Sequence, residues 1–260
     1  MKEVAQVSPD AFVQMALQLT WWRLYKKPTP IYESSSTRFF KEGRTETGRS
    51  TSLESVAFCR AFDDDDVLYA TKRDLFAKAV KSQSLWMRDA AMGKGIDRHM
   101  LGLRCMIQAE EMEKATMFTD PSYIDSMWFR LSTSNMSPGT HFYGGFGPVV
   151  PDGYGVNYAI GKDDLKFSIS SKRSAPSTSS YKFREKLEQT LIDLLILFPK
   201  RTEVWGMGWE TKFKHEKRGD KMIETMKVLT DKQLKQQLGV ASKYTRKPKE
   251  AAPGSDDEQK

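Results

Sequence analysis

Apolar residues recur with helical spacing over much of the N-terminal half of the chain. Ser8-Pro9-Asp10 combines an N-cap, a proline suited to the first helical position and an acidic residue near the positive end of the dipole, so it predicts a helix over 9–25. Apolar positions cover most of its circumference, which indicates burial on several sides. Further helices are predicted over 51–62, with a capping box from Thr51 to Glu54, over 71–92 and over 96–112.

Strand-like alternation of apolar and polar residues follows Pro121. Strands are predicted over 128–134 and 165–170, with a hairpin partner over 156–160, while the glycines and hydroxyl residues of 38–49 favour loop and strand edge. A last amphipathic helix is predicted after Ser177-Thr178-Ser179-Ser180. Its inward residues are Phe183, Leu187, Leu191, Leu194, Leu195 and Phe198. The pattern predicts an α/β fold, with helices packed on a mixed β-sheet of which this chain holds part.

The distribution of charge separates the chain into two parts. The net charge is +7, but residues 199–260 contain 15 basic and 10 acidic residues, so little of the excess lies in the body. We therefore expect no nucleic-acid partner, and we predict that 199–260 is a basic, partly disordered extension with an exposed helix over 222–238 and a disordered tail from Lys243.

Other broad classes are excluded by composition. The two cysteines, Cys59 and Cys105, have no CxxC spacing, so neither a disulfide scaffold nor a cysteine metal site is expected. No apolar stretch approaches the roughly 18 residues of a transmembrane helix. The N-terminus has no readable targeting signal. His99, His141 and His215 lack metal-site spacing; His99 is predicted to be a packed or capping residue, and none resembles a general base.

Two segments carry candidate chemistry. Alternation puts the hydroxyls of Ser132 and Ser134 on the same face of a strand end, where they could stabilise an oxyanion; a polar strand end facing solvent is the alternative, and the pattern alone favours it. Gly144-Gly145 and the glycine- and proline-rich loop 146–155 allow close approach of a ligand, or form an ordinary turn. The spacing of a phosphate-binding loop is missing.

Five motifs in this chain resemble, in order and spacing, those of the carnitine/choline acyltransferase family. They are Tyr32-Glu33-Ser34, Gly43-Arg44-Thr45-Glu46-Thr47, Gly95-Ile96-Asp97-Arg98-His99, Leu131-Ser132-Thr133-Ser134 and the loop from Gly147 to Gly155. The resemblance covers 8–198 and implies a fold like that of chloramphenicol acetyltransferase. It implies that 1–198 is the C-terminal half of the family's two-domain fold and that an N-terminal half is missing.

The resemblance implies a site for L-carnitine. Residues matching Tyr32, Thr45 and Arg98 hold its carboxylate, a role that suits two hydroxyls and a guanidinium. Choline has no carboxylate, and choline acetyltransferases lack this Thr and Arg, so carnitine is favoured. Phe146 matches the aromatic residue that meets the trimethylammonium group. The resemblance also places Ser34 and Ser132 in the carnitine pocket.

It further implies sites for the acyl donor. Ser134 matches the hydroxyl that stabilises the oxyanion, and Asp10 and Asn135 fall where the family touches coenzyme A. Gly144 replaces the methionine that closes the acyl pocket of the acetyl-transferring members. Because 40–47 and 169–172 most resemble the carnitine palmitoyltransferases, a long acyl group is expected, with octanoyl next. Acyl-CoA is a co-substrate, and no permanent cofactor or metal is expected.

Three departures from the family leave two interpretations open. None of the histidines matches the family's general base, which belongs to its N-terminal half, and Glu3 and Ser84 stand where a lysine and often an arginine occur. The chain is then either the C-terminal portion of a carnitine O-acyltransferase or a non-catalytic homologue that binds carnitine or a partner. The resemblance favours a mitochondrial location, with the peroxisome as the alternative, and leaves peripheral membrane contact open.

Overall fold

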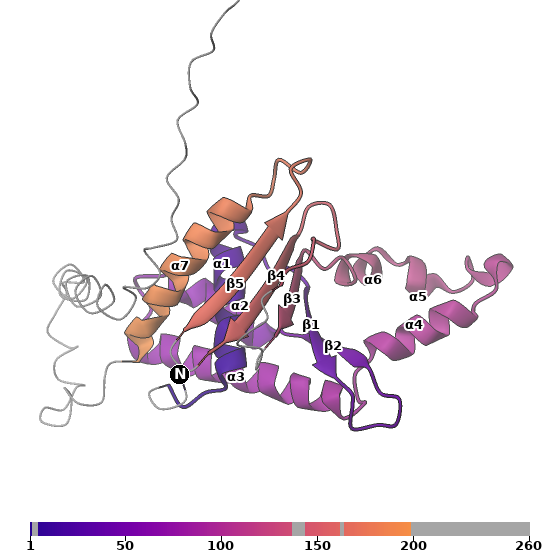
Figure 1. Ribbon diagram of the computed structural model, residues 1–260, viewed down its shortest axis with the longest axis horizontal. Coiled ribbons are helices and arrows are strands. Elements are labelled where there is room, and N and C mark those ends of the chain that lie inside the picture. The colour runs from indigo at the N-terminus through magenta and orange to yellow at the C-terminus, as the bar shows by residue number, and fades with distance from the viewer. Residues whose placement is uncertain (2–4, 137–143, 162–163, 199–260) are drawn as a thin grey trace, which may run out of the picture. The chain divides into compact units, whose positions relative to one another are not determined.

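The computed structural model describes residues 1, 5–136, 144–161 and 164–198 (Figure 1). Glu3, His141, His215, the helix expected over 222–238 and the tail lie outside the described residues. The helices are α1 (Pro9–Tyr25), α2 (Leu53–Phe62), α3 (Tyr69–Ala91), α4 (Asp97–Met106), α5 (Thr116–Thr119), α6 (Pro121–Ser126) and α7 (Ser180–Leu194), with 3-10 turns at Ala109–Glu111 and Leu195–Leu197.

The strands form one mixed sheet, which confirms the predicted fold class. They are β1 (Ile31–Ser36), β2 (Thr45–Arg49), β3 (Leu131–Asn135), β4 (Tyr154–Ile160) and β5 (Leu165–Ser171), in the order β2-β1-β3-β4-β5. The inner strands β1, β3 and β4 are parallel, whereas β2 and β5 pair antiparallel at the edges. Helices α1, α2, α3 and α7 cover one face of this sheet (Figure 1).

Helix α1 forms the centre of the core, as its sequence predicts. The Ser8 side chain caps it by accepting from the Ala11 amide at 3.4 Å, and every residue from Ala11 to Trp21 is buried. The helix packs against α2, α3 and α7. On the sheet side, Gln14 donates to the Thr133 hydroxyl and to the Tyr158 hydroxyl, both at 3.0 Å. The buried surface of α1 therefore includes polar side chains, whose hydrogen bonds are satisfied within the core.

Residue alternation gives the sheet two different faces. Ile31, Leu131, Val156 and Tyr158 point to the helices and are at most 2% exposed. The alternate residues form the opposite face, here called the polar face. Its members are Tyr32, Ser34 and Ser36 of β1, Thr45, Thr47 and Arg49 of β2, Ser132 and Ser134 of β3, Gly155, Asn157 and Ala159 of β4, and Lys166, Ser168 and Ser170 of β5. Most side chains of this face carry hydroxyl groups.

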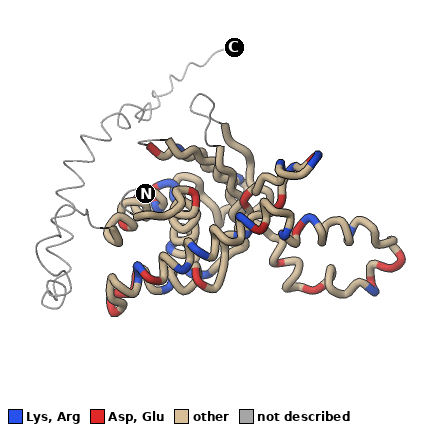
Figure 2. The backbone as a smooth tube through the Cα atoms, turned by 90° about the horizontal axis from the view of Figure 1, so that it is seen from below, with Lys and Arg blue, Asp and Glu red and all other residues tan. Residues whose placement is uncertain are grey.

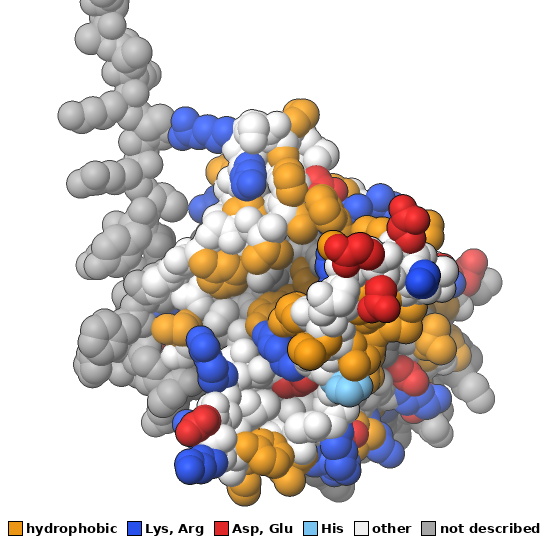
Figure 3. Space-filling model, turned by 90° about the vertical axis from the view of Figure 1, so that its right-hand side faces the viewer, with side chains coloured by type: hydrophobic (Ala, Val, Ile, Leu, Met, Phe, Trp, Pro, Cys, Tyr) orange, Lys and Arg blue, Asp and Glu red, His pale blue; other side chains and the backbone are white. Residues whose placement is uncertain are grey.

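The segment from α4 to α6, here called the arm, extends away from the body (Figures 1 and 2). Asp97 is the only buried residue of α4, and α5 and α6 have none. Exposed apolar side chains gather along the arm (Figure 3): Leu101, Leu103, Met106, Met117 and Ile124. Among the described residues, no helix is long and apolar enough to cross a membrane.

Several local predictions need correction. The capping box of α2 joins Ser52 to Ser55, one residue after the predicted pair, because Leu53 is the first helical residue. Helix α3 begins earlier than predicted, at Tyr69, with no side-chain cap. Leu195 is 43% exposed rather than inward, because the chain tightens there into a 3-10 turn. His99 is exposed, so it is neither packed in the core nor buried as a cap.

Candidate functional site

The polar face aligns hydroxyls from neighbouring strands. Tyr32 of β1 lies opposite Arg49 of β2 and Ser132 of β3, and Ser132 lies opposite Gly155 of β4. One residue pair further along, Ser34 lies opposite Thr47. The carnitine-site candidates on β1, β2 and β3 thus share one surface, because residues of the same phase in neighbouring strands point to the same side.

Arg98, the second residue of α4, reaches this face from outside the sheet. Its Nη2 donates to the Tyr32 hydroxyl at 3.2 Å and to Thr45 Oγ1 at 3.4 Å, and its Nε donates to the Thr45 carbonyl at 3.2 Å. Nη1 donates to Thr47 Oγ1 at 3.4 Å. The structure therefore brings Tyr32, Thr45 and Arg98 together, although they were identified from three separate motifs.

Arg98 differs from Arg49, the other arginine at the polar face, in having no acidic partner among the described residues. Arg49 holds Asp97 in a two-pronged ion pair, at 2.9 and 2.6 Å. Within the described part of the chain, the Arg98 guanidinium forms no ion pair with an acidic side chain and bonds only to neutral oxygens. An exposed, unneutralised guanidinium beside hydroxyl donors is suited to a carboxylate.

The β3 serines occupy the same face with different burial. Ser132 is 3% exposed, and Ser134 is half-buried. Ser34 is exposed, and its hydroxyl lies 3.3 Å from that of Tyr32. In the part of the chain that the structure describes, no hydrogen bond joins Ser134 to Arg98. The oxyanion candidate therefore lies on the shared face without a direct connection to the arginine.

The segment from Gly144 to Gly147 lies over β4 and β5 on the polar face. Asn157 Nδ2 donates to the Gly144 carbonyl at 2.6 Å, and the Ser170 hydroxyl donates to the Phe146 carbonyl at 2.5 Å. A Cβ at Gly155 would approach the Phe146 carbonyl oxygen to 2.5 Å, so a glycine is needed where the loop crosses the strand. Phe146 is half-buried, and no described contact links its ring to Arg98.

A groove of about 520 Å³ opens at the carboxyl ends of β1 and β3. Asp10 and Asn135, the predicted coenzyme A residues, both line it, and Asn135 donates to Asp10 at 2.7 Å. Arg38 and Arg88 contribute positive charge to its lining. Open α/β sheets commonly bind ligands at the carboxyl ends of their parallel strands, so this groove is the second candidate site.

The buried carboxyl group of Glu33 and the half-buried one of Asp10 form one wall of the groove. The Tyr158 hydroxyl lies 2.7 Å from Asp10 Oδ1 and 2.9 Å from Glu33 Oε1, and Gln83 donates to both carboxyl groups. Burial, together with the nearby Asp10 charge, raises the pKa of Glu33 well above its usual range. Burial and the two carboxylates likewise raise the pKa of Tyr158.

Sequence reasoning missed several residues of this site. Thr47 shares the phase of Thr45, so alternation could have identified it as a further hydroxyl near Arg98. Glu33 stands between Ile31 and Ser35 in the buried phase of β1, where a carboxyl group is unusual enough to have marked it. Arg49 gave no such signal, because its partner Asp97 is 48 positions away in the sequence.

The fold and the polar face together define an α/β domain that carries the Arg98 guanidinium beside several hydroxyls, with a groove at the carboxyl ends of β1 and β3. Within the described residues, no group of three or more potential metal ligands occurs. Comparison with known proteins identifies the family. Residues 1–189 match the choline/carnitine O-acyltransferase family, and the chain belongs to that family.

Two human relatives illustrate the similarity. The chain is 41% identical to carnitine O-acetyltransferase of Homo sapiens over 192 residues, which are 74% of this chain and 31% of the relative. It is 42% identical to choline O-acetyltransferase of Homo sapiens over 189 residues, which are 72% of this chain and 25% of the relative. The chain therefore spans only about a third or less of these relatives. The family resemblance is confirmed, but the long acyl chain stays a prediction.

Proposed function

We propose that this chain binds L-carnitine on the polar face and takes part in acyl transfer between coenzyme A and the carnitine hydroxyl. The supporting observation is the convergence of the Arg98 guanidinium on the Tyr32 and Thr45 hydroxyls, at 3.2 and 3.4 Å, while Arg49 is already neutralised by Asp97. Because the chain spans 31% of the carnitine O-acetyltransferase relative, the complete reaction is part of this proposal.

The carboxylate separates carnitine from choline as the substrate. Both carry a trimethylammonium group, for which the aromatic ring of Phe146 is the proposed partner. Only carnitine has a carboxylate to accept hydrogen bonds from Arg98. The similarity to a choline O-acetyltransferase is as high as that to a carnitine O-acetyltransferase, so overall identity does not decide between the substrates. The Arg98 cluster favours carnitine.

The proposed reaction is a direct transfer. The carnitine hydroxyl oxygen attacks the thioester carbonyl carbon, the carbon–sulfur bond breaks, and a base passes the hydroxyl proton to the departing sulfur. Ser134 would donate to the oxygen that becomes negative during this step. The family resemblance assigns the base to a histidine in its N-terminal half, which is one reason why a carnitine-binding homologue without catalysis is the second candidate.

The groove at the carboxyl ends of β1 and β3 is the proposed site for coenzyme A. Asp10 and Asn135 would offer polar contacts there, and Arg38 and Arg88 would favour an anionic ligand. We further propose that the acyl group is longer than acetyl. In the part of the chain that the structure describes, a Cβ at Gly144 would meet nothing within 4 Å, which supports open space at this position.

Calorimetric titration of the whole chain with L-carnitine and with choline tests the proposal. We expect tighter binding of carnitine. Arg98→Gln should weaken carnitine binding about tenfold or more, the worth of a hydrogen bond to a charged group, and change choline binding less than about twofold. Arg60→Gln, at an exposed position on α2, is the matched control. Equal affinity of the unaltered chain for both ligands would contradict the proposal.

Catalysis has a separate test. Carnitine-dependent release of free thiol from palmitoyl-CoA and from acetyl-CoA, compared with a Ser134→Ala variant, measures transfer by the chain itself. Release that depends on Ser134 supports the acyltransferase. Carnitine binding without any release supports the second candidate, a homologue that binds carnitine without transferring an acyl group.

A further inference from the structure

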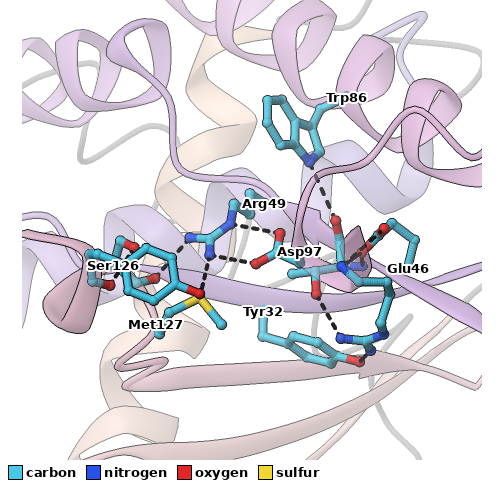
Figure 4. Close-up of polar contacts among 10 residues, drawn as sticks. Tyr32, Glu46, Arg49, Trp86, Asp97, Ser126 and Met127 are labelled. Carbon is cyan, nitrogen blue, oxygen red and sulfur yellow. Dashed lines mark hydrogen bonds and ion pairs between the residues drawn. The ribbon is translucent and has the colours of Figure 1, made fainter. Parts of the chain in front are cut away.

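The position of Arg98 depends on where α4 begins, because Arg98 follows Asp97, the first residue of that helix. Two sets of contacts fix this helix start. One is the ion pair between Arg49 and Asp97, and the other is a pair of hydrogen bonds to Glu46 (Figure 4). Within the described residues, neither Arg49 nor Glu46 bonds to the Arg98 guanidinium, so both act on it only through the backbone.

Arg49 joins the two ends of the arm. Besides its ion pair with Asp97, its Nη1 donates to the Ser126 carbonyl at 2.8 Å, and its Nη2 lies 3.2 Å from the Met127 sulfur. The guanidinium also lies over the Phe129 ring, 4.9 Å from the centroid. Asp97 is 3% exposed. One planar side chain thus holds the first residue of α4 and the last residue of α6 together.

Glu46 fixes the same helix start from β2. Its Oε1 accepts from the Arg98 amide at 3.2 Å and from the Thr47 amide at 2.6 Å. A Cβ at Gly95 would approach Glu46 Cγ to 2.2 Å, so the glycine allows this close packing. The carboxylate is therefore occupied by backbone donors at the helix N-terminus, where a negative charge is stabilising.

We propose that Arg49 and Asp97 form a positioning pair. The pair holds the Arg98 guanidinium where it can bind the carboxylate of a ligand, so that the site prefers L-carnitine to choline, which has no carboxylate. This inference rests on the proposed role of Arg98 as the carboxylate ligand. Arg49 does not take that role itself, because Asp97 already fills its donor fork. Because Arg49 also bonds to Ser126 at the end of α6, the preference for carnitine depends on the contact between the two ends of the arm.

Variants that keep the net charge of the face test the pair. In Arg49→Lys, a single ammonium group can meet Asp97 but cannot also reach the Ser126 carbonyl in the manner of a planar fork. In the double variant Arg49→Gln/Asp97→Asn, both charges are removed together, which leaves no buried charge unpaired. We expect each to weaken L-carnitine binding about five- to tenfold, while choline binding changes less than about twofold.

The matched control removes an exposed ion pair in the same way. Asp74→Asn/Lys78→Gln acts on an i,i+4 pair of α3 whose side chains are both 61% exposed, and it should change neither affinity. Parallel loss of carnitine and choline binding in the Arg49 variants would indicate a merely structural role and overturn the inference. So would unchanged selectivity in variants that are folded by circular dichroism.

The unaltered chain gives an independent test if the variants do not fold. Nitrogen-15 spectra of the arginine side chains should show the Arg98 Nε–H resonance shifting with added L-carnitine, while the Arg49 resonance stays in place and exchanges slowly with water. A carnitine-induced shift of Arg49 as large as that of Arg98 would overturn the positioning role. If the unaltered chain does not prefer carnitine to choline, the proposed function fails instead.

Discussion

Asp10 and Glu33, from α1 and β1, approach the same hydroxyl, that of Tyr158, at 2.7 and 2.9 Å. Two ionised carboxylates so close together in a buried site would repel each other, so the arrangement favours one shared proton. The raised pKa of Glu33 assigns that proton to Glu33. The groove at the carboxyl ends of β1 and β3 is therefore bordered by a glutamate side chain that holds its proton more strongly than a free glutamate does.

This assignment predicts how stability depends on pH. A raised pKa in the folded state means that folded Glu33 retains a proton that the unfolded chain has lost, so its contribution is fully present below the unfolded pKa and is lost as pH rises toward the folded pKa. Between these two pKa values the free energy of unfolding should fall by up to about 1.4 kcal/mol per pH unit because of Glu33. Glu33→Gln should abolish this fall. Urea unfolding at a series of pH values measures it.

The control for this experiment is Glu188→Gln, which alters an exposed carboxyl group on α7. Its stability should follow the pH dependence of the unaltered chain. If the stability of Glu33→Gln also follows the pH dependence of the unaltered chain, folding does not raise the pKa of Glu33, and the inference of a shared proton is wrong.

Substitution by alanine should have opposite effects on stability at Gly95 and at Gly102. A Cβ at Gly95 would lie 2.2 Å from Glu46 Cγ, whereas a Cβ at Gly102, within α4, would meet no described atom within 4 Å. Gly95→Ala should therefore cost about 1–3 kcal/mol through overpacking. Gly102→Ala should stabilise α4 by about 0.5–1 kcal/mol, because alanine favours a helix interior.

Chemical denaturation and amide exchange of α4 distinguish the two glycine variants. Slower exchange in Gly102→Ala and faster exchange in Gly95→Ala are the expected results. Equal effects of the two alanines would mean that the contact with Glu46 does not constrain Gly95.

The sequence predicted those parts of the site that depend on local spacing. Alternation put Ser132 and Ser134 on one face, and the helix signals at Ser8 predicted where α1 begins. The approach of Arg98 to Tyr32 could be expected only from the family resemblance, because the two residues are 66 positions apart in sequence and meet through strand order and helix placement. The pairs Arg49–Asp97 and Asp10–Glu33 depend on the same tertiary arrangement, and they were missed.

Arg23 links three helices at the edge of the core. It pairs with Asp63, just after α2, at 2.5 Å and with Asp193 of α7 at 2.7 Å, and its own side chain is 12% exposed. Arg23→Ala should lower stability by about 1–3 kcal/mol, since the partners are partly exposed and recover some hydration. Lys78→Ala, in the exposed pair of α3, should cost less than about 1 kcal/mol. Equal thermal shifts in the two variants would contradict a linking role for Arg23.

Gly144 offers the sharpest test of acyl-chain length. Because a Cβ at this position would meet nothing within 4 Å among the described residues, Gly144→Met should fold with little change in stability while filling the space proposed for the acyl chain. Binding of palmitoylcarnitine should then weaken about tenfold or more, as expected when several buried methylenes lose their place, and binding of acetylcarnitine should change little. Gly144→Ala, with a much smaller side chain, is the control. Weakening of both acylcarnitines to the same extent would place Gly144 in the carnitine pocket rather than in the acyl pocket.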